Sequence, residues 1–168
     1  IYVAKKDGVH EYSAKVFIDC TGDANIAAFA GVPFEKGSSD GELQPATLCF
    51  IIANINTEAL KNVNLYGYSE NSPIQQIIES DEYPLITQSH LCVDYLADGI
   101  ISFNAGHIFD SDGTDPRCVS DAIMRGRRLA EEYHRAFRDV MPEAFGKSFL
   151  IATAPLLGIR ETRRIQGK

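Results

Sequence analysis

The chain has 168 residues, of which 45% are hydrophobic, 23% charged and 10% aromatic. This composition is typical of a soluble globular domain, since a chain of this length can bury a core of its own. It excludes a disordered or collagen-like chain, and apolar runs such as residues 48–53 are far shorter than the ~20 residues of a membrane-spanning helix. The net charge of −7 argues against nucleic acid as a partner.

The two ends of the chain resemble cuts within a longer protein. The chain opens on Ile1-Tyr2-Val3-Ala4, without an initiator Met or a signal-peptide core, and it stops just after an arginine-rich segment. We therefore expect an internal fragment of a longer parent. A cytoplasmic location is favoured, and export of the parent remains open because signal peptides lie at true N-termini.

The cysteines give no sign of a metal site. Cys20, Cys49, Cys92 and Cys118 form no Cys-x-x-Cys pair and have no histidine at zinc-ligand spacing. All except Cys118 lie in apolar, strand-like runs. We interpret these three as buried thiols that pack as small hydrophobic side chains.

The first 35 residues predict a β-hairpin and then a strand, a glycine turn and a helix. Residues 2–4 and 11–14 flank an Asp-Gly turn, which favours a hairpin. Residues 15–20 are mostly apolar and indicate a buried strand. An alanine-rich helix is expected over residues 24–30, with Gly31 at its C-terminal cap.

The middle of the chain is predicted to be rich in β-strands. Residues 48–53 form an apolar run typical of a central strand, and residues 149–154 form another. Residues 85–95 and 100–104 are separated by Asp-Gly, which indicates a second hairpin. Short surface helices are expected over residues 57–61 and 72–80 because each opens on a hydroxyl residue.

One long amphipathic helix is predicted over about residues 116–141. Asp115 is placed to cap it, with Pro116 at the first helical position and Pro142 as the stop. Steps of three and four residues from Val119 to Val140 give one continuous apolar stripe. The opposite face carries Arg and Glu or Asp at i,i+4 spacing, which is typical of a solvated face. Together these elements predict an α+β fold with a mixed, largely antiparallel β-sheet and one long helix.

The most informative segment for chemistry is Thr21-Gly22-Asp23, between the strand and the helix expected near the N-terminus. A helix N-terminus offers free amide groups and a positive dipole end, which suit a phosphate or another anion. Glycine also permits close approach of a flat ligand. The alternative is a turn that only packs the helix against the strand.

Three segments resemble a family of bacterial FAD-dependent oxidoreductases. Residues 17–32 (FIDCTGDANIAAFAGV) are similar to a flavin-proximal segment, residues 157–167 (LGIRETRRIQG) to a second segment and residues 44–48 (QPATL) to a third. The family is related to glutathione reductase and fumarate reductase, and it places a β-rich substrate domain within an FAD-binding domain. This chain lacks the Gly-x-Gly-x-x-Gly motif that holds the FAD pyrophosphate.

The resemblance implies a division of the chain. Residues 1–35 would be a strip of the FAD-binding domain and residues 36–156 the substrate domain. Residues 157–168 would be an arginine-rich segment where flavin and substrate meet. The rest of the parent chain would be a necessary partner, so the fragment alone would be inactive, and the surface left exposed could drive homo-oligomer formation.

The resemblance also assigns residues to the site. Arg160 would act on the substrate, because a guanidinium pairs with an anion or with negative charge on reduced flavin. His107 is the candidate proton donor, since imidazole titrates near neutral pH, and His90 and His134 are weaker candidates. The residues expected to contact FAD are Thr21, Gly22, Asp23, Gln44, Arg163 and Arg164. The alternatives are a solvated arginine tail, in which Glu161 pairs locally, and a surface histidine.

Two functions from different classes follow. In the first, the parent is an FAD-dependent oxidoreductase that transfers a hydride between a small organic substrate and the flavin. In the second, the segment is a non-catalytic ligand-binding or interaction domain. A hydrolase is disfavoured because no Gly-x-Ser-x-Gly elbow places a nucleophile beside a base.

Overall fold

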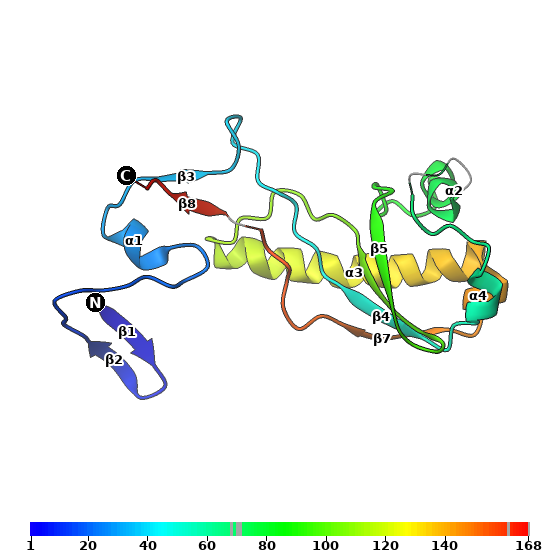
Figure 1. Ribbon diagram of the computed structural model, residues 1–168, viewed down its shortest axis with the longest axis horizontal. Coiled ribbons are helices and arrows are strands. Elements are labelled where there is room, and N and C mark those ends of the chain that lie inside the picture. Colours follow the sequence, from blue (N-terminus) through cyan, green and yellow to red (C-terminus); the bar gives the residue numbers. More distant parts are fainter. Residues whose placement is uncertain (68, 70–71, 161, 168) are drawn as a thin grey trace. The chain divides into compact units, whose positions relative to one another are not determined.

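A computed structural model describes residues 1–67, 69, 72–160 and 162–167. The chain divides into two compact units. The first contains Ile1–Glu35 and Arg163–Lys168, and the second contains Lys36–Thr162. Each is described by itself below, with the elements labelled in Figure 1.

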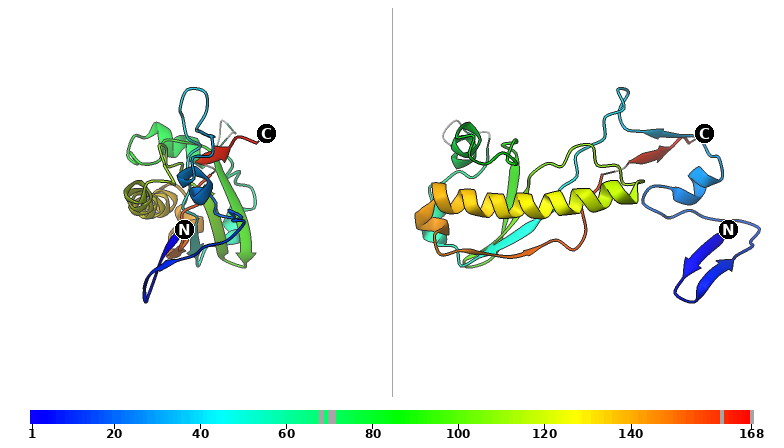
Figure 2. Two further views of the ribbon diagram at one scale, coloured as in Figure 1. Left: turned by 90° about the vertical axis from the view of Figure 1, so that its left-hand side faces the viewer. Right: turned by 180° about the vertical axis from the view of Figure 1, so that it is seen from behind.

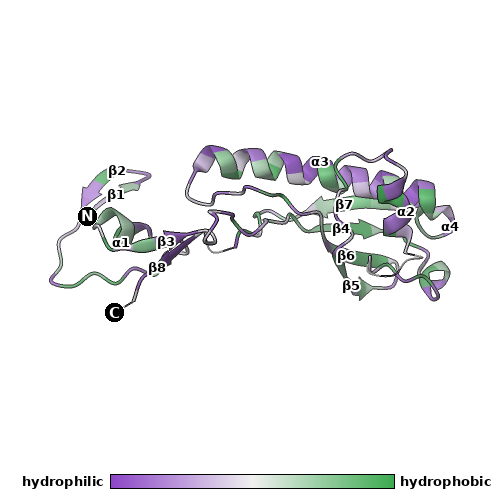
Figure 3. Cartoon of the chain, turned by 90° about the horizontal axis from the view of Figure 1, so that it is seen from above, coloured by the Kyte–Doolittle hydropathy of each residue, from purple (hydrophilic) through white to green (hydrophobic). Residues whose placement is uncertain are grey.

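The larger unit is built on a four-stranded sheet in the order β5-β6-β4-β7. The strands are β4 (Phe50–Ala53), β5 (Leu91–Ala97), β6 (Ile100–Ala105) and β7 (Phe149–Thr153), and every pairing is antiparallel. Figure 3 shows them side by side in this order, with many hydrophobic residues along them. The predicted α+β fold class is confirmed, with the apolar run at residues 48–53 forming a central strand.

Both predicted hairpins are present, but only the second turns at its predicted Asp-Gly pair. In the first, Lys5 pairs with Gly8, so the turn lies at Lys6 and Asp7 and the second strand begins at Gly8 instead of residue 11. Asp98 and Gly99 join β5 to β6, and Gly99 has φ of +69°, a conformation that glycine adopts at little cost. The first strand begins at Leu91 rather than at residue 85. Before it, the Leu85 amide donates to the Glu132 carboxylate at 2.7 Å, so this stretch is held by a side chain instead of a strand.

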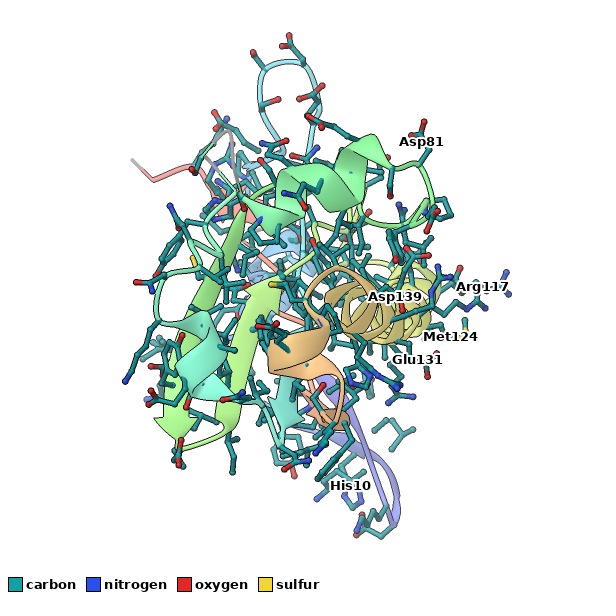
Figure 4. The ribbon with its side chains drawn as sticks, turned by 90° about the vertical axis from the view of Figure 1, so that its right-hand side faces the viewer. His10, Asp81, Arg117, Met124, Glu131 and Asp139 are labelled. Carbon is teal, nitrogen blue, oxygen red and sulfur yellow. The ribbon has the colours of Figure 1, made fainter. Side chains whose placement is uncertain are left out.

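The long helix α3 (Pro116–Val140) has the predicted bounds. The Asp115 carboxylate accepts a hydrogen bond from the Arg117 amide at 2.9 Å, which satisfies one of the free donors at the helix start. Figure 2 shows α3 as one uninterrupted helix. Its outer side carries Arg117, Met124 and Glu131, whose side chains point away from the strands (Figure 4).

An aromatic cluster joins α3 to the sheet. Phe103 in β6 stacks on Phe50 in β4 with ring centroids 5.2 Å apart and meets Phe137 of α3 at 5.3 Å. Tyr133 lies 5.8 Å from Phe50, and Phe145 lies 5.0 Å from Phe137. All five rings are fully buried. Rings of this size dominate the energy of a core, so this cluster fixes α3 against the sheet.

Three short helices close one end of this core. They are η1 (Thr57–Leu60), α2 (Pro73–Glu79) and α4 (Pro142–Phe145). The predicted surface helices at 57–61 and 72–80 are thereby confirmed. In α2 the Ser72 hydroxyl accepts from the Ile74 amide at 3.3 Å, as expected for a hydroxyl cap.

The acidic residues of α3 do more than pair along a solvated face. Asp139 accepts a hydrogen bond from the Tyr83 hydroxyl at 3.0 Å. The Arg135 guanidinium lies 3.7 Å from Glu132 at i,i+3 spacing and stacks over the Tyr83 ring at 4.8 Å. The loop after α2 thus covers part of the face that the i,i+4 pattern assigned to solvent.

The smaller unit contains two strand pairs and one short helix. Strands β1 (Tyr2–Lys5) and β2 (Gly8–Glu11) form the predicted hairpin. Helix α1 spans Asn25–Phe29, and β3 (Phe34–Lys36) pairs with β8 (Arg163–Ile165). The sequence did not predict this last pair, because three-residue strands carry too few alternating positions to show a period.

The predicted buried strand at residues 15–20 is wrong. These residues are described, but they form no strand, and Val16 and Ile18 are 75% and 82% exposed. A strand needs a hydrogen-bonded neighbour, and no described segment pairs with this one. The apolar residues of this segment follow the pattern of a strand, but the neighbouring strand that would pair with it is missing among the described residues.

The interpretation of the cysteines is also wrong in part. All four are free thiols, but Cys20 and Cys92 are exposed, while Cys49 and Cys118 are partly buried. Cys92 lies on an edge strand, where alternate side chains face away from the core.

Among the described residues no helix is long and apolar enough to cross a membrane.

The close approach of α3 to the segment before β4 depends on Gly126. A Cβ atom at Gly126 would lie 2.6 Å from Leu48 Cβ and 3.1 Å from Ile108 Cδ1. Real Cβ atoms do not approach this closely, so a side chain here must displace the helix or the strand segment.

We therefore expect Gly126→Ala to lower the free energy of unfolding by about 1 to 3 kcal/mol, although the same change in an open helix position would stabilise by about 1 kcal/mol. Urea unfolding followed by circular dichroism measures the difference. Gly167→Ala is the matched control, since no described atom lies within 4 Å of its Cβ position. A free energy of unfolding of Gly126→Ala equal to or above that of the unsubstituted 168-residue chain would contradict the close packing.

Candidate functional site

Within the larger unit, three extended segments lie side by side next to the sheet. Ala46 and Ile108 exchange backbone hydrogen bonds of 2.9 and 2.8 Å, and Thr47 and Gly158 exchange bonds of 3.2 and 2.8 Å. Residues 46–47 are thus flanked by Ile108 on one side and Gly158 on the other. We call these three segments, residues 46–47, 107–109 and 157–160, the platform.

The platform has an inner face and an outer face. Ala46, Ile108 and Ala122 of α3 form a small buried cluster, with Leu157 and Ile159 packed against it. Side chains alternate between the two faces of an extended segment. Because Ile108 and Ile159 face inward, the neighbouring side chains, which include His107 and Arg160, belong to the outer face.

Two histidines meet at this outer face. The His107 ring stacks on the His90 ring with centroids 5.6 Å apart and an interplanar angle of 30°. Phe109 meets His107 edge-on at 5.9 Å. His90 immediately precedes β5, so its contact with His107 connects the start of β5 to the platform.

The surroundings of His107 lower its pKa below the usual 6.5, first through burial and then through the nearby positive groups His90 and Arg160. Burial penalises a charged imidazole, and like charges add to that penalty. The His107 imidazole is therefore neutral at pH 7. A neutral imidazole can accept a proton at its free ring nitrogen, and the proton-donor role of His107 stays a prediction.

Gly158 lies close to the backbone of Thr47 and near the Arg160 side chain. A Cβ atom at Gly158 would lie 3.1 Å from the Thr47 carbonyl oxygen, 3.4 Å from Thr47 Oγ1 and 3.9 Å from Arg160 Nη1. The Arg160 guanidinium thus lies beside Thr47 on the outer face. Arg160 is otherwise exposed, and Glu161, its expected local partner, lies outside the described residues.

The loop that connects the platform to α3 is held by charge and hydrogen bonds. Asp112 accepts from Lys36 Nζ at 2.5 Å and from the Thr114 amide and hydroxyl at 2.8 and 2.6 Å. The Gly113 amide donates to Thr162 Oγ1 at 3.0 Å. Burial alone would raise the pKa of Asp112, but Lys36 and Thr114 lower it to about 2.

In the smaller unit, the turn at Thr21-Gly22-Asp23 uses the helix amides itself. The Asp19 carboxylate accepts from the Thr21 amide at 2.9 Å and from the Ala27 amide at 2.8 Å, while Thr21 Oγ1 accepts from the Asn25 amide at 2.8 Å. These bonds hold the pKa of Asp19 below its usual value, the Ala27 amide having the largest effect. The expectation of free amides at this helix start is wrong, because a carboxylate already occupies it.

The same turn still leaves space for a flat group. An ideal Cβ atom at Gly22 has no described atom within 4 Å, and Thr21 and Gly22 are exposed. The backbone there is open from outside.

The two arginines on β8 differ in their contacts. The Arg163 guanidinium stacks over Phe34 at 5.0 Å, and its Nη1 is buried with no hydrogen-bond partner among the described residues. Arg164 Nη2 lies 3.5 Å from the Glu35 carboxylate. A buried donor without a partner costs free energy, so Arg163 could satisfy an oxygen atom of a ligand.

The structure brings some of the predicted site residues together and leaves others apart. His107 and Arg160 share the outer face of the platform, and Gln44 is exposed at the start of the same unit. Thr21, Gly22 and Asp23 form one turn of the smaller unit, and Arg163 and Arg164 belong to β8 there. His134 contacts Ser148 Oγ at 3.0 Å.

The sequence did not predict the contacts of His90 and Phe109 with His107 or the hydrogen bonds of Asp19. His90 and His107 are 17 positions apart, and only the β5–β6 pairing brings them together. Asp19 carried a local signal, since Asp followed two residues later by Thr often forms a turn in which the carboxylate accepts the backbone amide. Among the described residues, no group of three or more His, Cys, Asp or Glu side chains could hold a metal ion.

Comparison with protein families gives the class of the protein. The sequence model of the family described as FAD dependent oxidoreductase matches residues 1–168. The chain belongs to this family, and FAD is the cofactor that the family uses. The searches of curated proteins and of solved structures found no match.

The low pKa of Asp112 predicts an acid-dependent loss of stability. A carboxylate whose pKa falls from 3.8 to about 2 on folding contributes stability that is complete above pH ~4 and is lost as the pH falls through ~2. We expect the Asp112 carboxyl carbon to titrate near pH 2 in ¹³C NMR. We also expect Asp112→Asn to lower the free energy of unfolding at pH 7 by about 1 to 2 kcal/mol, after discounting for solvent screening.

Asp40→Asn is the control for this prediction, because Asp40 is exposed. This control substitution should leave the free energy of unfolding unchanged at pH 7. A normal midpoint near 3.9 for Asp112 would show that Lys36 does not hold this carboxylate in solution.

Proposed function

We propose that the protein containing this chain transfers a hydride between a small organic substrate and FAD, and that His107 and Arg160 act on the substrate. The observation that carries the proposal is the convergence of these two side chains on the outer face of the platform, in a chain that belongs to an FAD-dependent oxidoreductase family. When bound, the flavin supplies the hydride chemistry. The protein binds and orients the substrate.

Arg160 and His107 have complementary roles in this proposal. The Arg160 guanidinium offers several donors in a fixed plane and stays charged at every working pH, so it anchors an anionic or carbonyl group of the substrate. His107 is neutral because its pKa is lowered, chiefly by burial. It can therefore take a proton from a substrate hydroxyl or amine during oxidation.

The residues proposed to hold FAD fit this group in two respects. The open backbone at Gly22 admits a flat or extended ligand between Thr21 and Asp23, and the buried Nη1 of Arg163 lacks a protein acceptor. Gln44 and Arg164 complete the proposed set. The helix start behind Thr21 is excluded as a phosphate site, because Asp19 already neutralises it.

The proposal also assigns roles to the parts of the chain. Residues 1–35 belong to the FAD-binding part, residues 36–156 form the substrate domain, and residues 157–168 line the place where flavin and substrate meet. The four-stranded sheet and α3 support the second assignment, since they form a separate core that carries His107.

The first test is whether the protein binds flavin. We expect the purified product of the complete reading frame to retain the visible absorption bands of bound flavin after incubation with FAD and gel filtration, and the 168-residue chain alone to retain little. A colourless product that takes up no FAD would overturn the proposal and favour a non-catalytic ligand-binding domain. The product is checked for folding by circular dichroism before the flavin is added.

The second test concerns Gly22. A Cβ atom at this position has no described atom within 4 Å, and Gly22 is exposed, so we expect Gly22→Leu to leave the stability of the flavin-free protein unchanged. If FAD approaches the backbone here, the same variant should weaken FAD binding by at least about tenfold, or ~1.4 kcal/mol. Fluorescence titration of FAD into the full-length protein measures this.

Gly167→Leu is the matched control for this second test, because its Cβ position is also open and it lies outside the proposed turn. Equal FAD affinity in the Gly22→Leu and Gly167→Leu proteins would remove the turn from the flavin site.

A further inference from the structure

Helix α3 carries an excess of positive charge in an acidic chain. It has six arginines, no lysine and four acidic residues, a net charge of +2, whereas the whole chain has a net charge of −7. Three of these arginines, Arg125, Arg127 and Arg128, lie within one helical turn and are exposed. Neighbouring like charges on a helix surface repel each other, so this grouping does not serve the stability of the helix.

The acidic residue that the i,i+4 spacing offers to Arg128 is used elsewhere. Glu132 accepts a hydrogen bond from the Leu85 amide at 2.7 Å and lies 3.7 Å from the Arg135 guanidinium. In the part of the chain that the structure describes, no carboxylate forms an ion pair with Arg125 or Arg128. Both guanidinium groups are therefore available to an anionic group from outside.

These two arginines border a hollow that also has an apolar wall. The hollow has a volume of about 370 Å³ and is lined by Leu85, Asp121, Met124, Arg125 and Arg128. Met124 is 48% exposed, and its side chain points away from the strands (Figure 4). Asp121 brings one negative charge against two guanidinium groups, so the hollow keeps a net positive charge. We call it the α3 hollow.

The composition of the α3 hollow is typical of a contact between proteins. Arg and Met are enriched in such contacts, whereas Lys is depleted. The planar guanidinium of Arg matches the two oxygens of a carboxylate, and the flexible thioether of Met adapts to the shape of a partner side chain. An apolar side chain flanked by carboxylates satisfies both the charged and the apolar parts of the hollow.

We propose that the α3 hollow docks an acidic segment of another protein, which places an apolar side chain against Met124 and Leu85 and its carboxylates on Arg125 and Arg128. This inference goes beyond the proposed flavin chemistry and does not rest on it. A second copy of the chain does not suit the hollow through a two-fold contact, because the same arginines would then face each other.

A membrane surface or a nucleic acid duplex fits the α3 hollow less well than a short acidic segment. Both present an extended negative surface, which would also meet the acidic remainder of the chain. The apolar stripe of α3, which a membrane-surface helix would insert into lipid, is buried against the sheet. A peptide segment covers only the hollow, so local charge decides its binding.

The test uses a fluorescein-labelled peptide in which two leucines stand between two runs of glutamate. Its binding to the full-length protein is measured by fluorescence anisotropy. We expect micromolar affinity that weakens as the salt concentration rises, since exposed charge pairs are screened. The same peptide with glutamine in place of glutamate should not bind, and the peptide with glycine in place of leucine should bind about fivefold more weakly because it lacks the apolar anchor.

Substitutions then locate the binding site. Arg125→Gln combined with Arg128→Gln should weaken peptide binding by about tenfold through loss of two charge pairs. Met124→Ala should weaken it by about fivefold through loss of apolar contact. Lys61→Gln combined with Lys147→Gln is the matched control, because it removes the same charge at two other exposed positions, and it should leave the affinity unchanged.

Three results would overturn the inference. They are equal affinity of the arginine and lysine double variants, no peptide binding at millimolar concentration, and tighter binding of a DNA duplex or of vesicles containing phosphatidylserine than of the peptide. The glutamine and glycine peptides are tested on the unsubstituted protein, so the test stays decisive if a variant does not fold. None of these measurements needs FAD, so their failure is distinct from failure of the flavin-binding test.

Discussion

The close approach between α3 and the segment before β4 is the constraint on which the larger unit depends. At Gly126 the helix comes so near that a Cβ atom would lie 2.6 Å from Leu48 Cβ. The neighbouring buried cluster also contains two small side chains, Ala122 of α3 and Ala46 of the platform, together with Ile108. A helix pressed this closely against an extended segment fixes the plane of that segment, because protein interiors are close-packed and leave little room to shift. The outer face of the platform, with His107 and Arg160, takes its position from that plane.

The same segment is tied to the start of α3. Ile108 pairs with Ala46 through two backbone bonds, and seven residues later Asp115 caps the helix. Between them, Asp112 is anchored by Lys36 and Thr114. The segment between them is a polar turn, and polar surface loops without such contacts are usually mobile. Here an ion pair and the cap hold both ends, so the loop transmits the placement of α3 to His107.

The elements that the sequence predicted well are those with strong local signals. The α3 helix was predictable because Asp115, Pro116 and Pro142 mark its ends and its apolar stripe runs for 25 residues. The Asp98-Gly99 turn fixed the β5–β6 hairpin in the same way. The failures were non-local: residues 15–20 have the composition of a strand but no partner, and β3 pairs with β8 across more than a hundred residues. In the site, Arg160 and His107 were identified individually, whereas the stacking of His90 on His107 follows from the register of β5 and β6, which composition does not encode.

The charge state of His107 shows how local effects exceed the overall field of the protein. A chain with a net charge of −7 would, through its long-range field, favour protonated histidines, which would raise the pKa of an imidazole. The pKa of His107 nevertheless falls, through burial first and then through His90 and Arg160. Interactions beyond ~8 to 10 Å are largely screened at physiological salt, so burial and the nearby groups decide the pKa of His107. The net charge of the chain and the neighbours of His107 therefore act over different distances. The overall charge affects the solubility of the chain, while burial and the nearby groups set the pKa of His107.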